Sequence, residues 1–154
     1  MARSCRVTSA VGRSGTRGEQ LPQPLLEAWC RDRMSEPPVL LESNQREIVE
    51  QVIHEQSGVR QWSLHAVNCR SNHCHVVVTA LSYDGEQVRD QFKAWGTRRL
   101  KEHQQRHIEP GQKVRENWWT RKGSVRQVFD EESLAAAVMY TLEAQDRGGS
   151  KGNV

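Results

Sequence analysis

The stretch Ser71-Asn72-His73-Cys74-His75-Val76-Val77-Val78 places two histidines one residue apart at the start of a β-branched run. Alternate side chains of a β-strand share a face, so His73 and His75 point one way and Cys74 points the other. Imidazole nitrogens are common ligands of divalent metal ions. The spacing predicts a strand over 73–81 with two candidate metal ligands on one face. Cys74 is expected to be a small buried residue on the opposite face.

A second candidate for chemistry lies near the end of the chain, in the segment DEESLAAAVMY that closes at Tyr140. Asp130 can cap a helix, and the acids that follow suit a helical first turn, so we expect a helix over 131–145. Tyr140 lies off the apolar stripe of this segment and need not be a core residue. The other tyrosine, Tyr83, lies in a turn directly after the histidine strand.

The order of predicted elements indicates the fold class. We expect helices over 23–34, 43–58 (capped by Ser43), 87–105 and 131–145, strands over 59–68 and 73–81, and a loop or short strand over 118–129. In the strand over 59–68, simple alternation puts Trp62, Leu64 and Ala66 on one side. The short connection predicts an antiparallel pair of strands. This order favours an α+β, ferredoxin-like sandwich with an antiparallel sheet and helices on one face. Its first strand is missing, because residues 6–11 are a poor candidate.

Length and composition favour one domain. The chain has 154 residues, of which 27% are charged, and it lacks an apolar run of about 18 residues that could cross a membrane. We expect a disordered basic segment over 1–21, in preference to a transit peptide, then a folded domain over 22–147 and a polar tail over 148–154. The four cysteines form no Cys-x-x-Cys motif, which favours a reducing, cytoplasmic setting.

The positive charge is concentrated in one region. Residues 93–126 contain ten lysines or arginines and three glutamates, whereas the whole chain has a net charge of only +3. Such asymmetry indicates a polyanionic partner, with a solvated helix face as the alternative. The residues expected to lie near nucleic-acid phosphates are Lys93, Arg98, Arg99, Lys101, Arg121 and Lys122.

Four segments together resemble the single-tyrosine HUH transposases, above all the REP-associated tyrosine transposases and their insertion-sequence relatives. The segments, in order, are NHCHVVV at 72–78, FKAWGTRRL at 92–100, WWTRKGS at 118–124 and VMYTLE at 138–143. They resemble the histidine strand, the basic helix, the Trp-and-Gly segment and the nucleophile helix of that family. The resemblance covers about residues 40–145.

The resemblance implies a mechanism and a set of site residues. Tyr140 would attack a DNA phosphate and form a 5′-phosphotyrosine, while His73 and His75 would hold Mg²⁺ or Mn²⁺. Relatives carry an amide one turn after the tyrosine as third ligand, where this chain has Ala144, so we favour Glu143, with Gln145 as the alternative. The expected function is cleavage and strand transfer of single-stranded or hairpin DNA in transposition. Whether the enzyme is a monomer or a homodimer that exchanges the tyrosine helix stays open.

Three other functions remain open at this point. A catalytically decayed or domesticated DNA-binding protein would keep the fold and lose the chemistry. A nickase of replication or plasmid transfer would use the same chemistry, usually in a longer chain. A small zinc protein would use Cys69, His73 and Cys74, although alternation places His73 and Cys74 on opposite faces.

Overall fold

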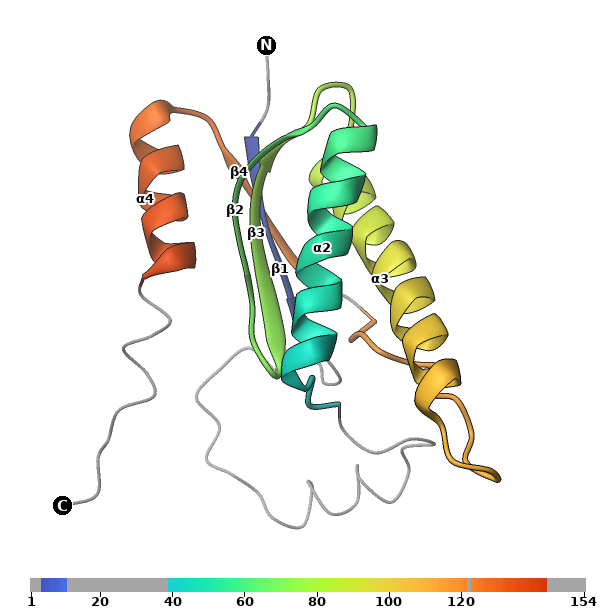
Figure 1. Cartoon of the computed structure of the whole chain (residues 1–154). Helices are drawn as coiled ribbons and strands as arrows, with labels where there is room; N and C mark the ends of the chain where they lie inside the picture. Colours follow the sequence, from blue (N-terminus) through green and yellow to red (C-terminus); the bar gives the residue numbers. More distant parts are fainter. Residues whose placement is uncertain (1–3, 11–38, 122, 144–154) are drawn as a thin grey trace, which may run out of the picture.

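The computed structural model describes residues 4–10, 39–121 and 123–143 (Figure 1). In chain order its elements are β1 (Ser4–Ala10), α2 (Ser43–Val59), β2 (Ser63–Cys69), β3 (His73–Thr79), α3 (Gly85–His107), β4 (Ser124–Val128) and α4 (Glu131–Leu142). From residue 43 onward, each described helix and strand corresponds to a predicted one. The predicted helix over 23–34 and the polar tail lie outside the described residues.

The four strands form one antiparallel sheet in the order β2-β3-β1-β4. The adjacent strands β2 and β3 pair as the short connection predicts, with Cys69 opposite Cys74 at the turn. One helix connects β1 to β2 among the described residues, and α3 connects β3 to β4. The predicted α+β class with a ferredoxin-like antiparallel sheet is therefore confirmed.

The segment expected to be irregular at the N-terminus contains the strand that the sequence analysis found missing. Residues Ser4–Ala10 form β1, which pairs with β3 on one side and with β4 on the other. Its sequence, SCRVTSA, has only two β-branched residues, Val7 and Thr8. Strand formation here follows from hydrogen bonding along both edges, which outweighs a weak intrinsic preference. The prediction of a disordered segment over 1–21 is wrong for residues 4–10.

A bulge in β2 changes which residues share a face. The register passes from Leu64 opposite Val78 directly to Ala66 opposite Val77, so His65 is an extra residue. Because a bulge reverses the alternation that follows it, Leu64 packs with the main core while Ala66 joins the cluster on the other face. The prediction that Trp62, Leu64 and Ala66 share one side is wrong at Ala66.

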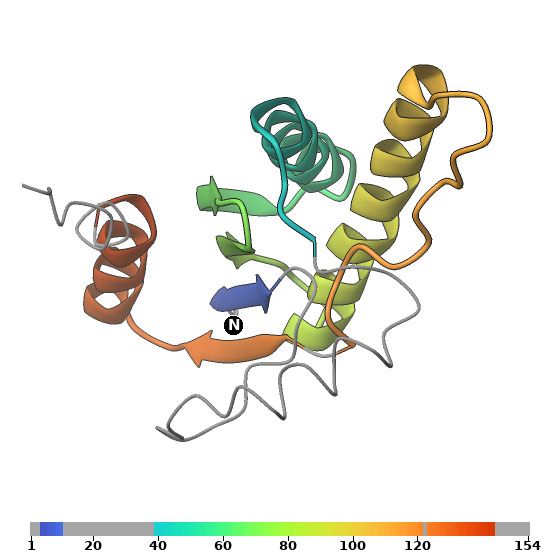
Figure 2. The same ribbon diagram turned by 90° about the horizontal axis from the view of Figure 1, so that it is seen from below.

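The helices lie on both faces of the sheet. Helices α2 and α3 cover one face, and α4 lies against the opposite face, over β2 and β3 (Figures 1 and 2). The α2–α3 side holds the larger core, to which Cys74, Val76 and Val78 contribute from β3. The α4 side buries a small cluster that includes Val77 and Ala137. The helices were expected on one face of the sheet. This holds for α2 and α3, whereas α4 lies on the other face.

Helix α3 is held to the segment before β4 by a tryptophan. Along α3 the buried residues follow a four-residue spacing through Val88, Phe92, Gly96 and Leu100. Trp119 packs on Gly96, where an added Cβ would lie 2.9 Å from the Trp119 ring. Its indole nitrogen donates to the Thr97 hydroxyl at 3.1 Å. Gly96 therefore occupies a position in the buried stripe of α3 where a larger side chain would collide with the Trp119 ring.

The helix starts are fixed by side-chain caps. Asp84 accepts from the backbone of Gln87 at the start of α3, at 2.8 Å. Glu42, rather than the predicted Ser43, is the N-cap of α2, and its backbone N–H donates to the Gln45 side chain at 2.9 Å.

None of the described helices has the length and apolar character needed to cross a membrane.

Candidate functional site: two histidines and a tyrosine

His73 and His75 lie side by side on the α4 face of the sheet. Their ring centroids are 4.8 Å apart, and the rings meet edge to face at 77°. The intervening Cys74 is buried in the core on the other face, as the alternation predicts. The strand backbone thus presents two imidazoles to the same space.

The hydrogen bond from His73 to its neighbour fixes the ring's tautomer. His73 Nδ1 lies 2.6 Å from the Asn72 side-chain oxygen. With this carboxamide oxygen as the acceptor, Nδ1 is the donor and carries the proton. In the neutral ring the lone pair then lies on Nε2, which is the form that binds metals while the other nitrogen donates to a supporting group.

Tyr140 reaches the histidines from α4. Its ring centroid lies 6.1 Å from that of His75, with the ring planes at 86°. The side chain is 47% exposed, so it is accessible to a large substrate and is not a core residue. The sequence prediction that Tyr140 lies off the buried stripe holds, because Ala137 and Thr141 are the residues that α4 buries.

The end of α4 is anchored to the sheet near the tyrosine. The Asn68 side chain of β2 donates to the Thr141 carbonyl at 2.9 Å, and Thr141 is fully buried. This contact joins β2 to the residue after Tyr140. Tyr140, the candidate nucleophile, therefore lies near the end of a helix that is hydrogen-bonded to the same sheet that carries the two histidines.

The described residues do not supply a complete metal cage. Among them, no group of three or more His, Cys, Asp and Glu side chains is arranged to hold a metal ion. Glu143, the favoured third ligand, is the exposed C-cap of α4. The alternative, Gln145, lies outside the described residues.

The zinc-protein alternative is not supported by the placement of its residues. Cys69 and Cys74 face each other in the main core, whereas His73 lies beside His75 on the opposite face. The hydrogen bond with Cys69, followed by burial, raises the pKa of the Cys74 thiol. A neutral, buried thiol suits the predicted apolar role of Cys74.

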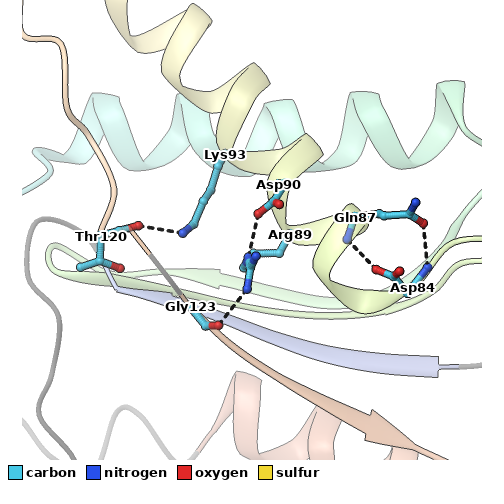
Figure 3. A network of polar contacts seen from close by, with 7 residues as sticks. All are labelled: Asp84, Gln87, Arg89, Asp90, Lys93, Thr120 and Gly123. Carbon is cyan, nitrogen blue, oxygen red and sulfur yellow. Dashed lines mark hydrogen bonds and ion pairs between the residues drawn. The ribbon is translucent and has the colours of Figure 1, made fainter.

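The basic residues of α3 lie in the layer that covers the other face of the sheet. Lys93 donates to the Thr120 carbonyl at 2.8 Å, next to the contact of Arg89 with Gly123 at 3.1 Å (Figure 3). Burial, followed by the nearby Arg89 charge, lowers the pKa of Lys93. Lys93 thus ties the segment before β4 to α3.

The other predicted phosphate contacts have varied surroundings. Arg99 forms an ion pair with Glu55 at 2.8 Å, and Arg98 pairs with Glu102 at 3.1 Å while lying over the Trp95 ring. Lys101 is half-buried on α3, Arg121 is exposed, and Lys122 lies outside the described residues. The residues on α3 lie across the sheet from His73, His75 and Tyr140, which together form the histidine–tyrosine centre.

Arg126 is a site candidate that the sequence analysis did not single out. It lies on β4 and lines a pocket together with Tyr140. The available signal was alternation: within 124–128, Val125 packs against the α2–α3 core, so its neighbour Arg126 belongs to the other face. The alternation is a weak signal here, because the strand has only five residues and follows a tryptophan-rich segment.

No family model and no curated protein matches the sequence. Among solved structures, the chain is similar to a REP-associated tyrosine transposase bound to a REP hairpin. That match has 13% identity and a TM-score of 0.57, and it covers 96% of this chain and 68% of the other. A candidate transposase from Deinococcus radiodurans R1 is also similar, with 12% identity, a TM-score of 0.50 and coverage of 91% and 88%. At these identities the likeness shows a shared fold: the chain has the α+β fold of these transposases.

Proposed function

We propose that this chain is a single-tyrosine DNA transesterase that cleaves and rejoins single-stranded or hairpin DNA in transposition. The observation that carries the proposal is the convergence of His73, His75 and Tyr140 on one face of the sheet. Their elements are separated by more than fifty residues in the sequence. A transposase bound to a REP hairpin is among the structural neighbours, which supports DNA as the partner.

In the proposed reaction the Tyr140 oxygen attacks the scissile phosphorus. A bond forms from this oxygen to phosphorus, and the bond from phosphorus to the 3′ oxygen of the preceding nucleotide breaks. The phenol proton passes to solvent, and the departing 3′ oxygen takes up a proton. Because the new phosphotyrosine bond is also a phosphodiester, the reverse attack by a 3′ hydroxyl rejoins DNA without an added energy source.

His73 and His75 fit a divalent ion as two of its ligands. Their rings adjoin on one face, and the Asn72 contact leaves His73 Nε2 with its lone pair. Imidazole suits Mn²⁺ better than Mg²⁺, which prefers oxygen ligands. When bound, the ion would polarise the scissile phosphate and offset charge on its oxygens. Glu143 is the proposed third ligand, with Gln145 as the alternative.

The second candidate function is DNA binding without cleavage, in a protein that keeps the fold. The observation that favours it is that the described residues provide two gathered ligands and no third. The two functions differ in one measurable product, a covalent protein–DNA adduct.

The test is incubation with end-labelled single-stranded and hairpin oligonucleotides and Mn²⁺ or Mg²⁺, followed by a denaturing gel. The wild-type chain should form an adduct, and Tyr140→Phe should form none, because only the attacking oxygen is removed. Tyr83→Phe is the matched control. Tyr83 packs against Trp62 in the α2–α3 core, 5.2 Å between ring centroids, and its substitution should leave the adduct unchanged.

Two outcomes would contradict the proposal. An adduct that persists in Tyr140→Phe would move the nucleophile elsewhere. No adduct from the wild-type chain over a broad oligonucleotide pool and both ions, with DNA binding retained, would favour the binding function.

A further inference from the structure

We propose that a pocket between β4 and α4 receives one unstacked base of the DNA strand, next to the phosphate that Tyr140 attacks. This inference rests on the proposed function and names a positioning site for it. The pocket has a volume of about 590 Å³, within the usual range of small-ligand sites. Its lining includes Arg126, Phe129, Ser133, Ala136, Ala137 and Tyr140.

The pocket adjoins the histidine–tyrosine centre at Tyr140. Tyr140 forms part of its wall, and the same ring meets His75 edge to face. A DNA strand whose phosphate lies at the Tyr140 oxygen therefore has a neighbouring nucleotide within reach of the pocket.

The α4 wall leaves space for a flat group. Ser133, Ala136, Ala137 and Tyr140 are spaced by three, four and seven residues, so they lie along one side of the helix. Three of the four have small side chains. A planar base can approach this wall closely, whereas larger side chains at 136 or 137 would fill the space.

Phe129 supplies a stacking surface at the pocket. Its side chain is 82% exposed, the highest value among the large apolar side chains that stand exposed in the described part of the chain. An isolated exposed apolar residue needs no special explanation. Phe129 differs because it lines a pocket shared with the candidate nucleophile. Aromatic rings of this kind stack on unpaired bases regardless of their sequence.

The charges around the pocket indicate where the DNA backbone runs. Arg126 on β4 is exposed and lines the pocket. The first turn of α4 carries exposed acids, Glu131 and Glu132. Phosphates are attracted by Arg126 and repelled by these acids, so the backbone should follow β4 while the base turns toward α4.

An unpaired base is the occupant that these features fit. A base inside a duplex has both faces stacked and cannot meet the Phe129 ring, so the nucleotide must be unstacked or already single-stranded. The lining also includes Gln127, Val128 and Asp130, and the Asp130 carboxylate accepts two hydrogen bonds from Ser133, at 2.7 and 2.8 Å. From Phe129 and the small side chains of α4 we infer a site that positions the strand by stacking on the base.

The test is a double-mutant cycle between Phe129 and individual DNA bases. Binding of a fluorescent single-stranded oligonucleotide is measured by anisotropy at fixed salt, with each base in turn replaced by an abasic site. The protein carries Tyr140→Phe, which prevents cleavage and keeps the ring. Phe129→Ala should weaken binding of the intact strand roughly tenfold. At one position, the abasic site should weaken binding to the protein with Phe129 intact by the same factor. With that abasic strand, Phe129→Ala should cause no further loss of affinity.

Two variants control for structure. Phe129→Trp keeps an aromatic face and should restore binding, which a merely structural role of Phe129 would not require. Val59→Ala removes another exposed apolar side chain, 75% exposed, at the end of helix α2 in the layer on the other face of the sheet, and should leave binding unchanged.

The outcomes separate this inference from the proposed function, which is read from the adduct of the chain with Tyr140 intact. An adduct together with unchanged binding by Phe129→Ala would overturn the pocket inference alone. The inference would also be overturned if the affinity losses from Phe129→Ala and from the abasic site added at every position. Absence of binding to single-stranded DNA would overturn it as well. Non-additive losses at one position without any adduct would support the pocket and count against the cleavage function.

Discussion

Asn72 supports the His73 ring through a hydrogen bond to one of its nitrogens. Its side-chain oxygen accepts from His73 Nδ1 at 2.6 Å. Removing such a supporting group typically lowers metal affinity by about 10- to 100-fold. We expect Asn72→Ala to weaken Mn²⁺ binding by that factor, measured by calorimetric titration of the DNA-free protein.

The matched control for this prediction is a third histidine on the same sheet. His65 lies on β2 and its Nε2 contacts the Thr79 hydroxyl at 2.7 Å, so His65→Ala should leave Mn²⁺ affinity unchanged. Equal affinity of Asn72→Ala and wild type would show that Asn72 does not orient the ligand.

Among the elements, the contact between α3 and the segment before β4 depends on Gly96. A Cβ there would lie 2.9 Å from the Trp119 ring, which the Thr97 hydroxyl holds in place. Overpacking of this kind costs about 1–3 kcal/mol, and the helix propensity of alanine returns at most about 1 kcal/mol. Gly96→Ala should therefore lower the free energy of unfolding in urea. Gly58→Ala in α2, with nothing within 4 Å of the added Cβ, should instead stabilise the chain, and a similar gain in Gly96→Ala would refute the packing role.

The stability of helix α4 should depend on pH through its N-cap residue, Asp130. The hydrogen bonds from the Ser133 backbone and hydroxyl lower the pKa of Asp130. A lowered folded-state pKa stabilises the fold above the unfolded-state pKa of about 3.9, and this contribution is lost as pH falls toward the folded-state pKa. Asp130→Ala should lower the melting temperature at pH 7, and its difference from wild type should shrink below about pH 4. Glu109→Ala, which removes an exposed loop carboxylate, is the control; a difference for Asp130→Ala that does not change with pH would contradict the capping role.

The elements that the sequence predicted well are those whose pattern is local. The alternation of His73 and His75 and the capped start of the tyrosine helix each depend on a few neighbouring residues, and the structure has β3 and α4 there. Pairing between distant segments leaves a weaker local trace. Strand β1 depends on partners on both sides, and the bulge at His65 depends on how β2 meets β3.

At the scale of the molecule, the sheet separates two layers with different roles. Helices α2 and α3 and the larger core stabilise one face, while the other face carries the histidines, α4 and the pocket of Phe129. Composition could not assign α4 to a face, because its alanine-rich sequence has little amphipathic contrast. The basic residues of α3 were predicted to lie near DNA phosphates, and the structure places α3 across the sheet from Tyr140.

The last prediction concerns the N-terminal strand, on which the whole sheet depends. Strand β1 joins β3 to β4, and β4 has no other strand partner in the described sheet. A chain that lacks residues 1–10 leaves β4 and the β3 edge unpaired, and unsatisfied backbone groups at a sheet edge are costly or promote aggregation. We expect this truncation to abolish the cooperative unfolding transition seen by circular dichroism, and with it any DNA adduct. Removal of residues 1–3 alone keeps β1 whole and should preserve the transition. If the chain without residues 1–10 still unfolds cooperatively at the wild-type urea midpoint, β1 is not the strand that holds β4 in the sheet.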